Sequence, residues 1–285
     1  MKVLVLGASG QLGKEFVDYL KDRTEVLAFT HDELDILSLE SLVDKFDEIS
    51  PNVVINCAAY TKVDQAEKEE ETAYKVNGIG AKNVSFASFK IKAKVVYFST
   101  DYVFDGTKNS PYNEFDSPNP VSVYGKSKLI GEIYTKEFNP NHLILRISWL
   151  YGINGSNFVK TIIRLSKEKG ELKVVNDQIG APTYTLDVVK QTWKLIQSNS
   201  VELYHSSNTG QTSWFEFAKR IIEKLNLNTQ VIPIKTEEHP ALAKRPSFSV
   251  LDNYLLKLEG KSIMRNWQEA FDEFVDRYRK ELIDG

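Results

Sequence analysis

Residues 1–13 read Met-Lys-Val-Leu-Val-Leu-Gly-Ala-Ser-Gly-Gln-Leu-Gly, and this stretch predicts the fold. Residues 3–6 have the composition of a short buried strand, which runs directly into Gly7, Gly10 and Gly13, and a helix is predicted to follow. Such a turn binds anions, because free backbone N–H groups and the helix dipole both favour a phosphate. We expect Gly7 to permit the turn, Gly10 to let a pyrophosphate approach, and Gly13 to let the helix pack on the strand. The alternative is a glycine-rich turn with no ligand.

Apolar runs of strand length alternate with segments of helical period through the first half of the chain. Further strands are predicted at residues 26–29, 53–56, 94–99 and 142–147, and helices at residues 39–49, 66–89 (one or two helices) and 124–138. Continuous apolar strands separated by helices indicate a parallel sheet that is covered on both faces. The predicted fold class is therefore α/β, with a doubly wound parallel sheet of the Rossmann type.

The pattern loosens after about residue 151. Helices are predicted at residues 158–169, 186–197, 214–225 and 267–282, and strands at residues 172–175, 203–205 and 231–234. We expect a dinucleotide-binding domain over residues 1–150 and a smaller, partly interleaved α/β substrate domain over residues 151–285. A segment near residues 183–203 is predicted to return to the first domain.

Composition narrows the class of protein. The chain has 285 residues with a net charge of −3 and no basic stripe, so no nucleic-acid partner is expected. No apolar run approaches the ~20 residues that cross a bilayer, so no membrane partner is expected either. The four histidines show no metal-ligand spacing, and no metal is predicted. A single cysteine, Cys57, and the lack of a recognisable targeting segment favour the cytoplasm.

Tyr124 and Lys128 form the one Tyr-x-x-x-Lys pair of the sequence, and the i, i+4 spacing places both side chains on one helix face. The helix follows a predicted strand that ends near Thr100, and ligands of doubly wound sheets lie at strand carboxyl ends. An ammonium beside a phenol is expected to lower the phenol pKa, so that Tyr124 exchanges a proton with a carbonyl or alcohol oxygen. Thr100 could orient the same oxygen. The alternative is a packed tyrosine beside a solvated lysine.

Several blocks of sequence resemble the extended short-chain dehydrogenase/reductases and, within them, the family of dTDP-4-dehydrorhamnose reductases. The blocks follow that family's order and cover residues 1 to about 250; they are Gly7-x-x-Gly10-x-x-Gly13, residues 56–64 (NCAAYTKVD), 99–106 (STDYVFDG), 124–132 (YGKSKLIGE) and 176–183 (NDQIGAPT).

The resemblance implies a reaction and a set of site residues. Thr100, Tyr124 and Lys128 match the catalytic set. A nicotinamide cofactor would deliver hydride to carbon 4 of a 4-keto-6-deoxy sugar on a dTDP carrier, giving dTDP-rhamnose, with Tyr124 as proton donor. The implied cofactor-binding residues are Gly7, Gly10, Gln11, Leu12, Gly13, Asp35, Ile36, Ala58, Ala59, Tyr60, Tyr124 and Lys128. The implied substrate-binding residues are Thr100, Asp101, Tyr102, Trp149, Asn157, Phe158, Gln178 and Arg245.

Departures from the family patterns bear on the alternatives. Tyr102 stands where related dehydratases carry a glutamate, so water elimination is disfavoured, and an epimerase or another nucleotide-sugar reductase is the second choice. A non-catalytic relative that serves as a regulatory subunit of methionine adenosyltransferase is a further alternative. Thr30 and His31 after the second strand favour NADPH, with NADH possible. Leu186 stands where a metal-bridged dimer would need a glutamate to accompany Glu15, so the resemblance leaves a monomer or a homodimer.

Overall fold

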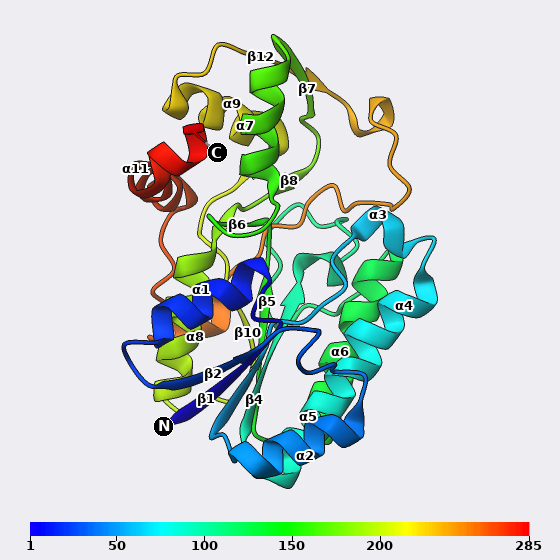
Figure 1. Ribbon diagram of the computed structural model, residues 1–285. Coiled ribbons are helices and arrows are strands. Elements are labelled where there is room, and N and C mark those ends of the chain that lie inside the picture. Colours follow the sequence, from blue (N-terminus) through cyan, green and yellow to red (C-terminus); the bar gives the residue numbers. More distant parts are fainter. Residues whose placement is uncertain (285) are drawn as a thin grey trace.

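A six-stranded parallel sheet forms the centre of the molecule, and the computed structural model describes residues 1–284 (Figure 1). The strand order is β10-β5-β4-β3-β1-β2. The bounds are β1 Lys2–Leu6, β2 Glu25–Phe29, β3 Val53–Asn56, β4 Lys94–Thr100, β5 His142–Ile147 and β10 Glu202–His205. Every neighbouring pair in this sheet is parallel, as the doubly wound arrangement requires. The predicted fold class is confirmed.

Helices cover both faces of the sheet. α1 (Gln11–Leu20) and α8 (Thr185–Gln197) pack together on one face, and α2 (Leu39–Ile49), α5 (Ala81–Lys90) and α6 (Val123–Phe138) lie on the other (Figure 1). Alternate residues of β1 supply the two cores, because successive side chains of a strand point to opposite faces. Val3 and Val5 pack in the cluster of α1 and α8, whereas Leu4 and Leu6 pack in the cluster of α2 and α5.

The predicted helical region over residues 66–89 divides into several pieces. These are α3 (Val63–Ala66), α4 (Glu70–Tyr74), the π-helical segment η1 (Lys75–Gly80) and α5. The short 3-10 helix η2 (Asp101–Val103) follows β4 directly. The π-helical segment η1 and the 3-10 helix η2 both lie beside the carboxyl ends of the central strands, where the candidate site is found.

The glycine turn has the conformation that its sequence predicts. Gly7 has a φ of +69°, in the left-handed region that favours glycine. A Cβ on Gly13 would overlap the carbonyl oxygen of Gly7, so only glycine lets α1 approach β1 this closely. A Cβ on Gly10 would meet just one atom, Gly7 O at 3.2 Å, so the space beside Gly10 is less filled than that beside Gly7 or Gly13.

The second half of the chain builds its own core. A parallel pair, β7 (Glu171–Val175) and β12 (Gln230–Ile234), packs with α7 (Phe158–Glu168), α9 (Trp214–Leu225) and α11 (Trp267–Asp284). The remaining elements are short: β6 Leu150–Tyr151, β8 Ile179–Gly180, β9 Thr183–Tyr184, β11 Thr212–Ser213, η3 Thr236–Glu238 and α10 Tyr254–Leu258. The sequence did not predict the two-residue strands or α10, because periodicity has no signal over so few residues. Among residues 1–284 no helix combines the length and the apolar character that crossing a membrane requires.

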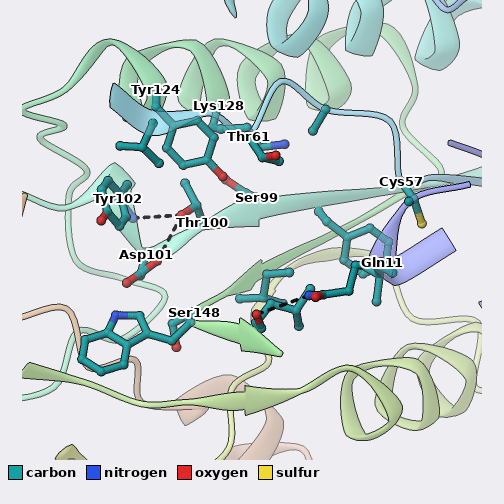
Figure 2. A pocket seen from close by; sticks show the side chains of 18 of the residues that line it. Gln11, Cys57, Thr61, Ser99, Thr100, Asp101, Tyr102, Tyr124, Lys128 and Ser148 are labelled. Atoms are coloured by element: carbon teal, nitrogen blue, oxygen red, sulfur yellow. Dashed lines mark hydrogen bonds between the residues drawn. The ribbon is translucent and has the colours of Figure 1, made fainter. Parts of the chain in front are cut away.

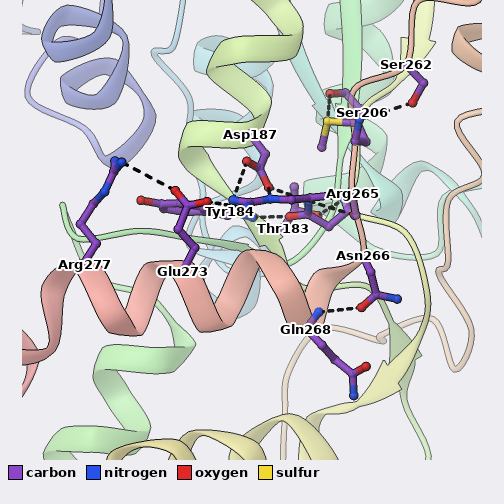
Figure 3. A network of polar contacts seen from close by, with 12 residues as sticks. Thr183, Tyr184, Asp187, Ser206, Ser262, Arg265, Asn266, Gln268, Glu273 and Arg277 are labelled. Atoms are coloured by element: carbon purple, nitrogen blue, oxygen red, sulfur yellow. Dashed lines mark hydrogen bonds and ion pairs between the residues drawn. The ribbon is translucent and has the colours of Figure 1, made fainter.

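After α7 and β7, and before α9, β12 and α11, the chain returns to the first sheet. α8 packs against α1, and β10 lies beside β5 at the edge of the sheet. We therefore propose a first domain made of residues 1–150 and 183–205, with the rest of the second half as the other domain. A polar network joins them: Arg265 donates two 3.0 Å hydrogen bonds to Asp187 on α8 and one of 2.5 Å to Glu273 on α11 (Figure 3).

Candidate active site

A cavity of about 550 Å³ opens at the carboxyl ends of the central strands, between the sheet and the second core. Its size is in the range of small-molecule sites. Twelve of the sequence-predicted residues line it: Gly10, Gln11, Leu12, Ala58, Ala59, Thr100, Asp101, Tyr102, Tyr124, Lys128, Trp149 and Phe158. Segments that are far apart in the sequence therefore meet in one cavity.

One end of the cavity is suited to a phosphate. Gly10 is the N-cap of α1 and makes no side-chain cap hydrogen bond, and the first turn of α1 carries no acidic residue. The backbone N–H groups of that turn are therefore available, and no carboxylate repels an anion. Gln11 is fixed at the mouth of this turn, because its amide donates to Leu150 O at 3.3 Å and accepts from Asn157 at 2.8 Å.

Three hydroxyl-bearing residues meet at the middle of the cavity. Figure 2 shows the hydroxyl of Tyr124 pointing from α6 toward Ser99 and Thr100 at the end of β4. Thr100 caps η2 by accepting from Tyr102 N at 3.2 Å, and its hydroxyl donates to Asp101 Oδ1 at 3.0 Å. Ser99 is 2% exposed, and its Oγ has no hydrogen-bond partner among the described residues. A ligand oxygen placed here would be within reach of several donors.

The start of α6 sets the position of the phenol. Ser122 caps the helix by accepting from Gly125 N at 3.1 Å. Gly125 packs directly on the carbonyl group of Tyr102, where a Cβ would clash, so α6 can approach η2 closely. The Tyr124 ring then meets the Tyr102 ring edge-on, with 5.7 Å between the centroids and 75° between the planes.

Burial governs the protonation of Tyr124. The expectation that Lys128 lowers its pKa is wrong in this structure: removal from water raises the pKa of the phenol, and the hydroxyl of Thr100 opposes that rise only in part. Within residues 1–284 no hydrogen bond joins Lys128 to Tyr124. The Lys128 ammonium lies 4.1 Å from the ring centroid of Tyr97 instead. Tyr124 is therefore protonated at neutral pH, which is the state of a proton donor.

Two further charged groups in the cavity are also shifted by burial. Removal from water lowers the pKa of Lys128 to about 7, although the carboxylate of Glu132 opposes the shift. Removal from water likewise raises the pKa of Asp101 to about 6, opposed by its hydrogen bonds. Perturbed groups that converge in one cavity are characteristic of functional sites.

Aromatic rings form the wall that the second core contributes. Trp149 and Trp214 stack with 3.4 Å between ring centroids and 5° between planes, and Phe158 lies 4.5 Å from Trp214. Trp149 has a φ of +44°, unusual for a bulky residue, and a Cβ on Gly180 would collide with its indole. The wall is therefore held in a strained position, as is common at binding sites.

Eight sequence-predicted residues lie outside the cavity lining: Gly7, Gly13, Asp35, Ile36, Tyr60, Asn157, Gln178 and Arg245. Gly7 and Gly13 shape the turn itself. Ile36 is 4% exposed in the apolar core, and Asp35 accepts a 2.9 Å hydrogen bond from Leu37 N.

The other outlying residues have partners of their own within the protein. Tyr60 donates its hydroxyl hydrogen to Glu69 at 2.7 Å. Gln178 is buried and donates to Thr236 at 3.1 Å. Arg245 donates to Asp64 Oδ2 at 2.6 Å. A ligand that used these residues would act beside these contacts or replace them.

Residues missing from the sequence prediction also line the cavity, notably Thr61, Ser99, Ser148 and Trp214. Ser99 carried a signal, since it ends a predicted strand beside Thr100. Trp214 carried none, because only tertiary folding brings the start of α9 against Trp149.

The end of β2 bears on the choice of dinucleotide. Glu33 accepts hydrogen bonds from both the backbone N (2.8 Å) and the hydroxyl (2.9 Å) of Thr30. An acid at this strand end suits a ribose hydroxyl and repels a 2′-phosphate. The sequence prediction considered Thr30 and His31 but missed Glu33, which lies three residues after Thr30 and folds back to contact it.

No group of three or more His, Cys, Asp or Glu side chains is arranged to hold a metal ion in the part of the chain that the structure describes.

Comparison with known proteins identifies the family of the chain. Spore coat polysaccharide biosynthesis protein SpsK of Bacillus subtilis is 44% identical over 275 residues, covering 96% of each chain. A dTDP-4-dehydrorhamnose reductase of Aggregatibacter actinomycetemcomitans is 40% identical over 283 residues, covering 94% of this chain and 96% of the relative. The dTDP-4-dehydrorhamnose reductase of Bacillus anthracis, whose crystal structure is in complex with NADP, is 46% identical in sequence. The two structures match with a TM-score of 0.95, over 97% of this chain and 99% of the relative. The model of the family described as "RmlD substrate binding domain" matches residues 1–280, and the chain belongs to that family.

Proposed function

We propose that this protein is an NADPH-dependent reductase of a dTDP-4-keto-6-deoxy sugar, and that it converts dTDP-4-dehydrorhamnose to dTDP-rhamnose. One observation carries the proposal: the uncapped N-terminus of α1 and the phenol of Tyr124 open into the same cavity. The names of the Aggregatibacter and Bacillus anthracis relatives support the substrate class. The NADP in the latter's structure supports NADPH, and it outweighs the carboxylate of Glu33, which is exposed and therefore screened by water and salt.

The residues present fit a dinucleotide. The free amides of the first turn of α1 suit the pyrophosphate, and Gly10 leaves room for it. Ala58 and Ala59 line the floor beside this turn and offer no bulk that would exclude it. When bound, reduced nicotinamide supplies a hydride to an electrophilic carbon.

Tyr124 is the proposed proton donor. Its raised pKa keeps the phenol protonated, and its hydroxyl faces the end of β4, where the ketone oxygen would lie. As negative charge develops on that oxygen, Tyr124 gives it a proton, and Ser99 and Thr100 are placed to orient it. Lys128 lines the same cavity, and its ammonium is assigned to stabilise the tyrosinate that results.

The sugar nucleotide is assigned to the aromatic side of the cavity. Trp149, Trp214 and Phe158 form an apolar wall suited to a 6-deoxy sugar. Tyr102 offers no carboxyl group at the position from which a dehydratase would protonate its substrate. Arg245 is assigned to the diphosphate, because a guanidinium pairs well with phosphate oxygens.

The test is an assay of the purified protein with dTDP-4-dehydrorhamnose and NADPH. We expect stoichiometric NADPH oxidation and formation of dTDP-rhamnose, identified by mass spectrometry and by comparison with authentic product. A folded sample that binds NADPH but never oxidises it with this substrate would refute the reductase assignment and favour a non-catalytic role.

A further inference from the structure

We propose that Asp64 is a positioning residue for the substrate diphosphate, which it serves by holding the guanidinium of Arg245 at the rim of the cavity with one edge free. The inference rests on the proposed function for the identity of the ligand. Asp64 ends the sequence block at residues 56–64, but nothing in the sequence pairs it with Arg245, since the two residues are 181 positions apart.

The contact joins two distant parts of the chain beside the cavity. Asp64 lies on α3, directly after Val63, which lines the cavity. Its Oδ2 accepts from Arg245 Nη2 at 2.6 Å, and its Oδ1 accepts from Ala243 N at 3.1 Å. One carboxylate thus fixes both the backbone before Arg245 and the guanidinium itself.

A second observation concerns the hydrogen-bonding capacity that Arg245 retains. Arg245 Nε is buried and has no hydrogen-bond partner among the described residues. An unpaired N–H of a guanidinium is costly to bury, whereas a phosphate oxygen would satisfy it. Asp64 accepts from Nη2, whereas Nε carries a separate hydrogen atom, so the two anions need not compete for the same hydrogen atom.

The surroundings place this free edge near the substrate. Tyr102 and Val63 line the cavity, and Asp64, the residue after Val63, holds the guanidinium beside this wall. Pro246, the next residue, packs against Gly106, where a Cβ would lie 2.7 Å from Pro246 Cα. The backbone after Arg245 is therefore held as firmly as the backbone before it.

The experiment compares Asp64→Asn, Arg245→Gln and the double variant. Asparagine keeps the size of the side chain and an oxygen for Ala243 N but lacks the charge that orients Arg245. We expect KM for dTDP-4-dehydrorhamnose to rise by about fivefold or more in Asp64→Asn, as loss of a partly exposed ion pair allows. The kcat should stay within about twofold, and KM for NADPH should not change, because a diphosphate held equally in ground and transition states affects KM alone. The Kd of thymidine diphosphate, measured by calorimetry, should rise by the same factor.

Two controls separate positioning from general structure. Asp272→Asn removes an ion pair of like exposure and length, Arg220 Nη2 to Asp272 Oδ2 at 2.6 Å, away from the cavity, and it should leave both constants unchanged. In the Arg245→Gln background, Asp64→Asn should add nothing, because its effect passes through the guanidinium.

Three results would overturn the inference: an unchanged KM in Asp64→Asn, multiplicative effects in the double variant, or tighter thymidine diphosphate binding in Asp64→Asn. Failure of the proposed function gives a different pattern, since an inactive wild-type protein would still show the expected change in thymidine diphosphate affinity.

Discussion

Replacing Tyr124 with phenylalanine isolates the proton that the proposed mechanism assigns to this residue. The change removes one hydroxyl and keeps the ring, which packs edge-on against Tyr102 with 5.7 Å between centroids. Because burial raises the pKa of Tyr124 above its ordinary value of about 10, no more than roughly one phenol in a thousand is ionised at pH 7. Tyr124 therefore carries its proton in essentially every molecule, and removal of the hydroxyl should remove its whole contribution to kcat.

The expected loss in kcat is about 10²- to 10⁴-fold, equivalent to ~3–5 kcal/mol of transition-state stabilisation. We expect the upper part of this range, because the neighbouring hydroxyl groups of Ser99 and Thr100 are aliphatic alcohols, which are much weaker acids than a phenol. The affinity for NADPH should remain within about twofold, since the amides of α1 that are assigned to the pyrophosphate are untouched.

The assay is steady-state NADPH oxidation with dTDP-4-dehydrorhamnose, together with NADPH titration by fluorescence. Tyr102→Phe is the matched control: it removes a phenol hydroxyl from the adjoining ring in the same cavity and should cost less than about tenfold in kcat. The reasoning would be refuted if Tyr124→Phe kept kcat within tenfold of wild type, or if Tyr102→Phe lost as much as Tyr124→Phe.

Three further changes test other parts of the site. Gly10→Val should raise KM for NADPH by at least about tenfold and lower Tm only slightly, because its Cβ would meet a single protein atom, Gly7 O at 3.2 Å. Gly13→Val should lower Tm much more, because its Cβ would overlap Gly7, and equal Tm losses would contradict this division. Glu33→Gln should lower KM for NADPH by about threefold and leave KM for NADH unchanged, because a negative charge at the end of β2 is removed while the Thr30 contact is kept; parallel changes for both cofactors would count against this. Lys128→Met should flatten the pH dependence of stability. Folded Lys128 has a pKa of about 7 and the unfolded residue one of about 10.5, so between these values the unfolded chain binds more protons and the free energy of unfolding rises with pH. Urea denaturation of the wild type at about pH 7.5 and about pH 9.5 should show ~2 kcal/mol more of this rise than the variant, and identical slopes would exclude Lys128 as the source.

Short-range patterns were enough to predict most of the fold. The β1 run and the apolar strands at residues 53–56 and 142–147 bury side chains on both faces, so composition identifies them without knowledge of their partners. The three glycines are identified by their spacing after β1. The elements missed include β6, β8, β9, β11 and α10, which have two to five residues each, and the two-residue strands pair with segments from other parts of the chain.

The candidate site, like the fold, could be predicted from the sequence only in part. Gly10, Thr100, Tyr124 and Lys128 were identifiable because each lies at a fixed position relative to a strand end or a helix start. The direction of the Tyr124 pKa shift was not, because Lys128 extends over Tyr97 and burial dominates, and neither effect is visible in an i, i+4 spacing.

The sequence alone determined a glycine turn of the nucleotide-binding type and a parallel sheet, and it placed a tyrosine and a lysine at the carboxyl end of that sheet. These are local facts, set by side-chain period and by the one residue that tolerates a left-handed turn. Tertiary structure alone decided which distant residues meet: Trp214 stacks on Trp149, Glu33 folds back on Thr30, and Asp64 holds Arg245. The reason is physical, because burial, stacking and ion pairing depend on distances through space, and a linear sequence does not contain them until the chain has folded.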